Sequence, residues 1–249
     1  MVAIGRRVYG LGAVALGIGG LAFGALAAMG QQVPAHVAGP MAAYACAGLL
    51  IVAGIAINLP RVAAVAALVL TAWFALWTLG LPLPNALKQP LVWVSWESLA
   101  EDTAMVLGGL LAYALILGDS PRAAALRRYV RPVFGLCLVV FGTSEFVYSK
   151  FTASLVPTWL PPSQLAWTYL TGACQIAAGL AVLSRIQARL AATLLTAMYV
   201  VFGLIVHIPR LIADPTALGA WSEHGVNLVL CGAAWCLADS LAEPKPAPA

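Results

Sequence analysis

Eight apolar segments, each long enough to cross a bilayer as a helix, constrain this chain more than any other feature of its sequence. A spanning helix needs about 20 residues, with a range of about 17–25. Backbone amides and carbonyls cannot stay unpaired in lipid, so helices are the expected state of such runs. The segments lie at 8–29, 41–59, 62–81, 98–118, 132–150, 163–183, 190–208 and 225–241. The sequence therefore predicts an all-α polytopic membrane protein with about eight transmembrane helices.

The composition agrees with lipid as the solvent for most of the surface. Hydrophobic residues make up 62% of the chain and charged residues 9%, whereas soluble domains have about 45–50% and about 25%. No basic stripe interleaved with aromatic residues is present, so no nucleic-acid partner is expected. The lipid bilayer is the one partner that the composition itself predicts.

The basic residues predict the orientation of the chain. With the N-terminus inside, only Lys88, Lys150 and Arg210 fall on the outer side. Lys and Arg collect on the cytoplasmic side of membrane proteins, so we expect both termini in the cytoplasm and the protein in the inner (plasma) membrane. Ten basic residues would then be cytoplasmic: Arg6, Arg7, Arg61, Arg122, Arg127, Arg128, Arg131, Arg185, Arg189 and Lys245.

An internal repeat divides the segments into two sets of four. A shift of 125 residues aligns 44–96 with 169–221 without a gap. The matched pairs include Tyr44 with Tyr169, Gly54 with Gly179, Pro84 with Pro209 and Trp96 with Trp221. For the first helix we expect a shift of 123, which pairs Gly12 with Gly135, Gly19 with Gly142 and Phe23 with Phe146. Four helices are an even number, so the two units are expected to be parallel, related by an axis along the membrane normal.

This repeat predicts the domain organisation. Residues 1–118 form the first four-helix unit and 132–242 the second, joined by a basic cytoplasmic linker at 119–131. Residues 243–249 are expected to be a disordered tail.

Polar residues on the outer side mark a candidate site in the second unit. Glu145 lies five residues before Lys150, about 7 Å below the outer boundary at ~1.5 Å per residue. An acid at that depth usually faces a bundle interior or a wet cavity, and the alternative is that it pairs with a basic group or reaches the interface. Under the two shifts, polar residues of the second unit replace apolar ones of the first: Glu145 for Ala22, Gln175 for Leu50 and His207 for Pro82.

The candidate outer pocket combines these residues with neighbouring polar and aromatic groups. His207 and His224 flank one loop, but without H-x-x-x-H spacing we expect local hydrogen bonding and no metal site. Trp159 belongs to an expected aromatic belt at the interface, on which a quinone could also stack. The predicted pocket contains Glu145, Lys150, Gln175, His207, Arg210, Trp159 and His224.

The sequence predicts no tightly bound cofactor. The five cysteines form no C-x-x-C pair and are expected as small buried residues: Cys46, Cys137, Cys174, Cys231 and Cys236. Neither a haem, flavin or iron–sulfur ligand set nor a nucleotide-binding motif is found. Whether the chain is an enzyme stays open on these grounds.

Several short motifs of the second unit carry a family resemblance. They are Gly142, Glu145 and Lys150, then 156–161 (Val-Pro-Thr-Trp-Leu-Pro), 167–172 (Trp-Thr-Tyr-Leu-Thr-Gly), Gly179-Leu180, Arg185, Arg189, 207–210 (His-Ile-Pro-Arg) and Trp221. Over about 110 residues this pattern resembles the DoxX-like family of four-helix membrane proteins. The family usually has a glutamate at the position of Gln175, whose amide cannot carry a proton.

The resemblance implies a quinone-linked redox subunit that acts with a partner subunit. DoxX-like proteins include the large subunit of an archaeal thiosulfate:quinone oxidoreductase and a mycobacterial membrane oxidoreductase component, and most members have no assigned activity. Two other functions remain open: a non-catalytic assembly or partner-binding membrane protein, and a small-solute transporter.

The distribution of basic residues gives a testable topology. Reporter fusions within 119–131 and after Ala249 should report a cytoplasmic location, and insertions near 152–158 an external one. Alkaline phosphatase and green fluorescent protein fusions measure this directly. A reporter that places 119–131 outside would overturn the eight-helix topology.

Overall fold

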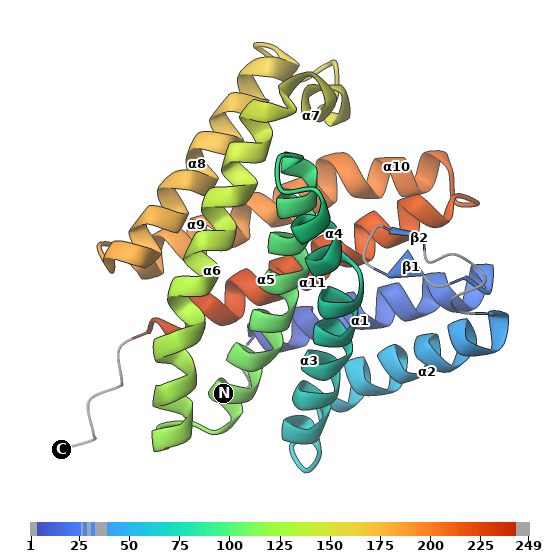
Figure 1. The fold of residues 1–249 in the computed structure, drawn as a ribbon, viewed down its shortest axis with the longest axis vertical. Coiled ribbons are helices and arrows are strands. Elements are labelled where there is room, and N and C mark those ends of the chain that lie inside the picture. Colours follow the sequence, from blue (N-terminus) through green and yellow to red (C-terminus); the bar gives the residue numbers. More distant parts are fainter. Residues whose placement is uncertain (1–3, 26, 29–30, 33–38, 243–249) are drawn as a thin grey trace.

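The computed structural model describes residues 4–25, 27–28, 31–32 and 39–242, and this part of the chain is helical apart from one short β-ladder (Figure 1). The ladder pairs β1 (Ala27–Ala28) with β2 (Gln31–Gln32). The helices are α1 (Ile4–Phe23), α2 (Pro40–Ala56), α3 (Ala63–Gly80), α4 (Pro82–Lys88), α5 (Trp93–Ile116), α6 (Pro121–Val147), α7 (Ser149–Leu155), α8 (Gln164–Ser184), α9 (Ala188–Phe202), the π-helix η1 (Gly203–His207), α10 (Ile208–Ala213) and α11 (Leu218–Ser240). The prediction of an all-α chain is confirmed. The expected disordered tail, 243–249, lies outside the described residues.

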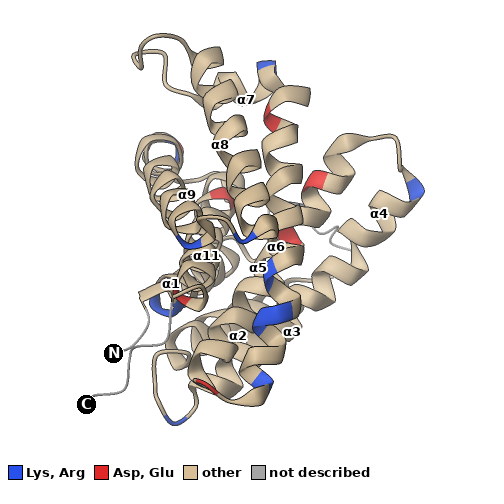
Figure 2. Cartoon of the chain, turned by 90° about the vertical axis from the view of Figure 1, so that its left-hand side faces the viewer, with Lys and Arg blue, Asp and Glu red and all other residues tan. Residues whose placement is uncertain are grey.

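Five helical stretches of the described chain are long and apolar enough to cross a membrane. They are Ala63–Lys88, Trp93–Ile116, Pro121–Val147, Gln164–Ser184 and Ala188–Ala213. Figure 2 shows how few positions along the ribbons carry a charge. Such helices satisfy their own backbone hydrogen bonds, which is the condition for lying in lipid. The chain therefore has the character of a membrane protein.

The sixth helix begins earlier than its apolar segment. Residues 121–131, expected as part of a linker, form the first turns of α6, and Pro132 lies inside the helix. Ser120 caps this start by accepting a hydrogen bond from the Ala123 amide at 3.2 Å, and Pro121 occupies the first helical position. A proline at that position loses no helical hydrogen bond, so the better start signal lies at 120–121 and not at Pro132.

Equivalent helices lie 125 residues apart. The correspondence relates α2 to α8, α3 to α9 with η1, α4 to α10, and α5 to α11. Individual hydrogen bonds follow the same shift. The Trp96 Nε1–H donates to the carbonyl of Pro90 at 3.0 Å, and the Trp221 Nε1–H donates to the carbonyl of Pro215 at 3.0 Å.

The first helix follows the same shift, so the expected shift of 123 there is wrong. A Cβ atom added to Gly17 would meet the carbonyl oxygen of Ala47, and one added to Gly142 would meet that of Gly172. Both members of the second contact lie 125 residues after those of the first. The glycines of α1 explain the error, because Gly10 and Gly17 have the same seven-residue spacing as Gly12 and Gly19. The counterpart of Glu145 is therefore Gly20, and not Ala22.

The helices form two bundles that share α5 and α11, which pack against each other. The first bundle adds α1, α2 and α3 to this pair, and the second bundle adds α6, α8 and α9. The first helix of each unit packs on the last helix of the other, α1 on α11 and α6 on α5. In Figure 1, α3, α5, α6 and α8 run roughly along the vertical, while α1, α2 and α11 run roughly across it.

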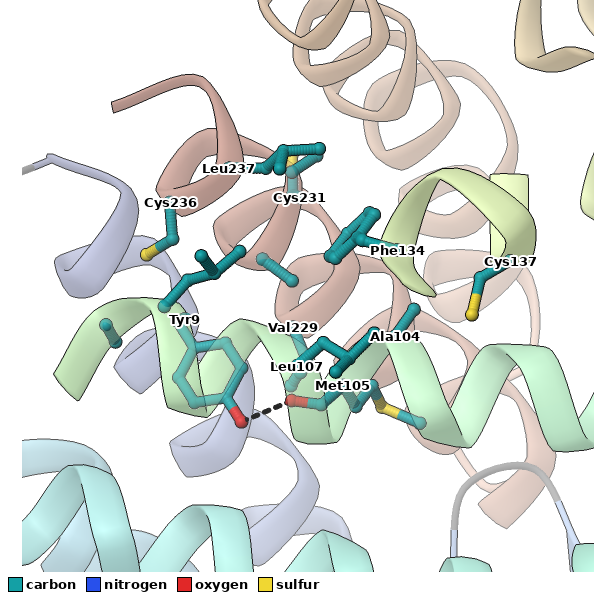
Figure 3. Packing of buried hydrophobic residues seen from close by; sticks show 14 of the residues in the cluster. Tyr9, Ala104, Met105, Leu107, Phe134, Cys137, Val229, Cys231, Cys236 and Leu237 are labelled. Atoms are coloured by element: carbon teal, nitrogen blue, oxygen red, sulfur yellow. Dashed lines mark hydrogen bonds between the residues drawn. The ribbon is translucent and has the colours of Figure 1, made fainter. Parts of the chain in front are cut away.

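The core lies where α1, α5, α6 and α11 meet (Figure 3). Tyr9 is fully buried there, and its hydroxyl donates to the carbonyl oxygen of Met105 at 2.7 Å. Cys137, Cys231 and Cys236 are buried as expected, and Cys46 is partly buried. The expectation of a buried residue is wrong for Cys174, which is exposed on α8. An apolar thiol on the outer face of a membrane helix can face lipid instead of a core.

The close approach of α6 to α8 gives a stability prediction. Gly142→Ala should lower the free energy of unfolding by about 1–3 kcal/mol, because the new methyl group would meet the backbone of Gly172 and neither helix can yield. The measurement is thermal unfolding of the purified protein in detergent.

Gly48→Ala is the matched control, since nothing lies within 4 Å of a Cβ atom at Gly48. It should be neutral or stabilising by up to about 1 kcal/mol, because alanine favours a helix more than glycine does. Equal effects of the two changes would contradict the packing described for α6 and α8.

Candidate functional site

Every helix of the second bundle contributes a polar side chain to its interior. Gln175 on α8 and Tyr199 on α9 are each 4% exposed, and Asn227 on α11 is 6% exposed. Glu101 on α5, Glu145 on α6, His207 on η1 and His224 on α11 are partly buried. We call these seven residues the polar centre.

Six buried atoms of the polar centre have no hydrogen-bond partner within the described chain. They are Glu145 Oε2, Gln175 Oε1, Tyr199 OH, His207 Nδ1, His224 Nδ1 and Asn227 Oδ1. Leaving a buried polar atom unpaired costs about 1–3 kcal/mol, so native proteins contain few of them. A group of six in one bundle therefore makes this bundle the candidate site of the described chain.

One side of the polar centre is acidic. Glu101 lies within electrostatic range of Glu97, Asp102 and Glu223. Tyr199 lies within electrostatic range of both Glu101 on α5 and Glu145 on α6. The described residues include one ion pair with these acids, between Glu223 and Arg210 at 2.6 Å.

The other side is formed by the two histidines around the π-helix η1. Asn227 faces the start of η1, because a Cβ atom at Gly203 would lie 2.8 Å from Asn227 Oδ1. His207, at the end of η1, lies within electrostatic range of His224 and Arg210. π-Helical turns are rare and occur frequently at functional sites. The equivalent stretch of the first unit, where α3 ends and α4 begins, has no π-turn.

Hydrogen bonds fix the start of α5 against the end of α6, next to Glu145. The Trp93 Nε1–H donates to Ser144 Oγ at 2.8 Å. The amide of Val94 donates to the Tyr148 hydroxyl oxygen at 3.0 Å. Trp93 and Tyr148 thus position the helix ends that carry the acids.

The structure separates the predicted pocket residues into two groups. Glu145, Gln175, His207 and His224 belong to the polar centre, and Arg210 is exposed but joined to it through Glu223. Lys150 is exposed on α7, and Trp159 is 69% exposed in the turn before α8. No ion pair joins Lys150 to Glu145 in the described chain, so the sequence proximity of these two residues does not bring their charges together.

Comparison of the units at the 125-residue shift shows which residues distinguish the second bundle. Glu101 corresponds to Val226, Glu145 to Gly20, Gln175 to Leu50, Tyr199 to Phe74, His207 to Pro82, His224 to Leu99 and Asn227 to Asp102. Tyr199, Asn227 and Glu101 are not among the pocket residues predicted from the sequence. The same shift applied to every polar residue would have identified Tyr199, because only a hydroxyl separates it from Phe74.

The described residues contain no group of three or more His, Cys, Asp or Glu arranged to hold a metal ion. The polar centre therefore offers hydrogen bonds and charge to a ligand, without a ready set of metal ligands.

The comparisons with known proteins match the second unit. Residues 134–231 are similar to a family described as a domain of unknown function (DUF8561). The matched stretch runs from α6 into α11, so it includes all of the polar centre except Glu101. No curated protein and no solved structure matches the chain.

The Tyr199–Phe74 pair gives a prediction that isolates the buried hydroxyl. Tyr199→Phe should leave thermal stability unchanged or raise it, because it removes a polar atom that has no partner in the described chain. Phe74→Tyr should lower stability by about 1–3 kcal/mol, since Phe74 is fully buried and a hydroxyl there would be unpaired. Thermal unfolding of the two variants side by side tests this. Marked destabilisation by Tyr199→Phe would mean that the hydroxyl has a structural partner.

Proposed function

We propose that the chain is an inner-membrane protein with eight transmembrane helices in two parallel four-helix units, with both termini cytoplasmic. The 125-residue correspondence supports the three spans beyond the five long apolar stretches. It relates α1 to α6, α2 to α8 and α11 to α5, and each of these partners is long and apolar enough to cross a membrane. Equivalent helices in one fold are expected to have equivalent surroundings.

The arrangement of the helices follows the repeat. In Figure 1, α1 and α2 run roughly across the view, and their counterparts α6 and α8 run roughly along the vertical. Arg131 lies within electrostatic range of Arg127 on the same helix and of Arg185 at the end of α8, as expected for a cytoplasmic surface.

The units 1–118 and 132–242 are proposed as sequence repeats and not as independently folding domains. Each contributes its first helix to a contact with the last helix of the other, and α5 and α11 belong to both bundles. The helical stretch that joins the units, residues 121–131, is continuous with α6.

The second bundle is proposed to bind the head group of a quinone, as a DoxX-like, quinone-linked redox subunit that acts with a partner subunit. The observation that carries this is the set of six unpartnered polar atoms inside an otherwise apolar bundle. Ligand sites typically combine an apolar lining with a few convergent polar groups. The Tyr199 hydroxyl can donate to a quinone carbonyl, and Glu145 and His207 can exchange the two protons that accompany two-electron reduction. The electrons would come from the partner.

Small-solute transport is a second candidate, and a separate observation favours it. Glu97, Glu101 and Glu145 form no ion pair within the described chain. Ionisable residues inside membrane helices usually mark ion or substrate pathways. No observation of this kind supports the third candidate, a non-catalytic assembly function. Unchanged quinone reduction in the following experiment would favour it.

The test is the rate of reduction of a water-soluble quinone by membranes with and without this protein, with thiosulfate and related sulfur compounds as donors. We expect the rate to fall on deletion. We also expect it to fall at least tenfold for Glu145→Gln and for His207→Ala at unchanged expression, because each variant removes a group that exchanges protons with the ligand.

Asp119→Asn is the matched control, because this acid is exposed and lies in the connection 117–120 between α5 and α6, 18 residues along the chain from Glu101. Its rate should match that of the unmodified protein. Unchanged rates in the deletion strain, together with co-purification of a stable partner without redox activity, would refute the quinone proposal and indicate an assembly protein.

A further inference from the structure

The acidic side of the polar centre contains carboxyl groups that no basic side chain of the described chain pairs with. Tyr199 lies within electrostatic range of Glu101 on α5 and Glu145 on α6, and Glu97 lies within electrostatic range of both acids. The basic side chain that forms an ion pair in this region of the described chain, Arg210, pairs with Glu223. A carboxyl group away from water is neutral unless a positive charge accompanies it, so a bound cation would stabilise the ionised form of these acids.

An independent observation points to a ligand at the same place. Tyr199 is 4% exposed, its hydroxyl has no hydrogen-bond partner, and it lies within electrostatic range of Glu101 and Glu145. The carboxylate oxygens of Glu101 and Glu145 are acceptors, and the Tyr199 hydroxyl oxygen can accept as well. A ligand that satisfies this side must therefore bring hydrogen-bond donors.

We propose that the acidic side of the polar centre binds a small organic cation with N–H donors, such as a primary ammonium group. An ammonium group supplies three donors and one positive charge, which matches carboxylates and amide oxygens. The absence of a three-residue metal-ligand group in the described chain favours this cation over a metal ion. The rings of Tyr199 and Phe202, with centroids 6.1 Å apart, offer an aromatic surface for the organic part.

The first bundle provides an internal reference for the number of sites. At the positions equivalent to Glu101, Glu145, Gln175 and Tyr199 it has Val226, Gly20, Leu50 and Phe74, none of which can hydrogen-bond to an ammonium group through its side chain. Asp102, at the position equivalent to Asn227, would be a carboxyl group without these partners. One cation per chain is therefore expected, in spite of the repeat. This inference rests on the ligand site proposed above but does not require that the site also takes a quinone.

The experiment is isothermal titration calorimetry of the full chain in lipid nanodiscs with n-propylammonium chloride. Propan-1-ol tests the need for charge, propionate tests its sign, and tetramethylammonium tests the need for N–H donors. We expect one saturable site for n-propylammonium, at least tenfold weaker binding of tetramethylammonium, and no binding of the alcohol or the anion. Sodium chloride at equal concentration should not displace the amine.

Glu101→Gln and Tyr199→Phe should each weaken n-propylammonium binding at least tenfold, whereas Asp119→Asn should not change it. Thermal unfolding of each variant shows whether it is folded. The inference is overturned if folded Glu101→Gln and Tyr199→Phe bind as the unmodified chain does, if the alcohol binds equally well, or if no binding occurs. If amine binding is absent while Glu145→Gln still slows quinone reduction, only this inference fails. If quinone reduction is also insensitive, the proposed ligand site fails with it.

Discussion

Close backbone contact between helices through small residues is the constraint on which this fold depends. In lipid, apolar side chains gain little by burial between helices, so association depends on packing, and small residues let backbones approach. Gly10 and Gly54 meet between α1 and α2, and the equivalent Gly135 and Gly179 meet between α6 and α8. Each helix pair has a second contact seven residues further along its first helix, Gly17 with Ala47 and Gly142 with Gly172. Since these contacts set the register of both helix pairs, they also decide which residues of α6 face the bundle interior, including Glu145.

The exchange of first and last helices between the units explains how a repeat can produce a single asymmetric site. Because α5 and α11 belong to both bundles, each bundle contains side chains from both units. Glu101 on the first unit's α5 thus lies within electrostatic range of Tyr199 on the second unit's α9. A substitution to a polar residue on α5 can therefore add a polar side chain to the second bundle alone. The equivalent position of the first bundle, on α11, carries Val226. Neither unit would contain the whole polar centre alone.

The sequence predicted the helices well and the site only in part, for physical reasons. Hydropathy and length locate apolar segments reliably, because the requirement for backbone hydrogen bonding in lipid leaves no other structure. The start of α6 was missed since Pro132 is a weaker signal than the Ser120 cap before Pro121. Lys150 and Trp159 were grouped with Glu145 because all three residues were expected at the outer side of the membrane. The side chains of Lys150 and Trp159 are exposed, whereas Glu145 is partly buried. Depth along a helix axis does not determine the direction of a side chain around it.

The difference between the bundles is best understood as a division between stability and binding. The first bundle carries Leu50 and Phe74 in its core, and both are almost fully buried apolar groups. The second carries Gln175 and Tyr199 at these positions, equally buried, and within the described chain Gln175 Oε1 and Tyr199 OH have no hydrogen-bond partner. Six unpaired atoms at about 1–3 kcal/mol each are comparable with the whole stability of a typical domain. A fold that retains them must gain stability elsewhere, and the first bundle, with Leu50 and Phe74 in its core and its glycine contacts, packs against α5 and α11. Binding of a polar ligand would then satisfy atoms that the protein leaves unpaired, so the second bundle should be the part of the molecule whose stability depends most on what it binds.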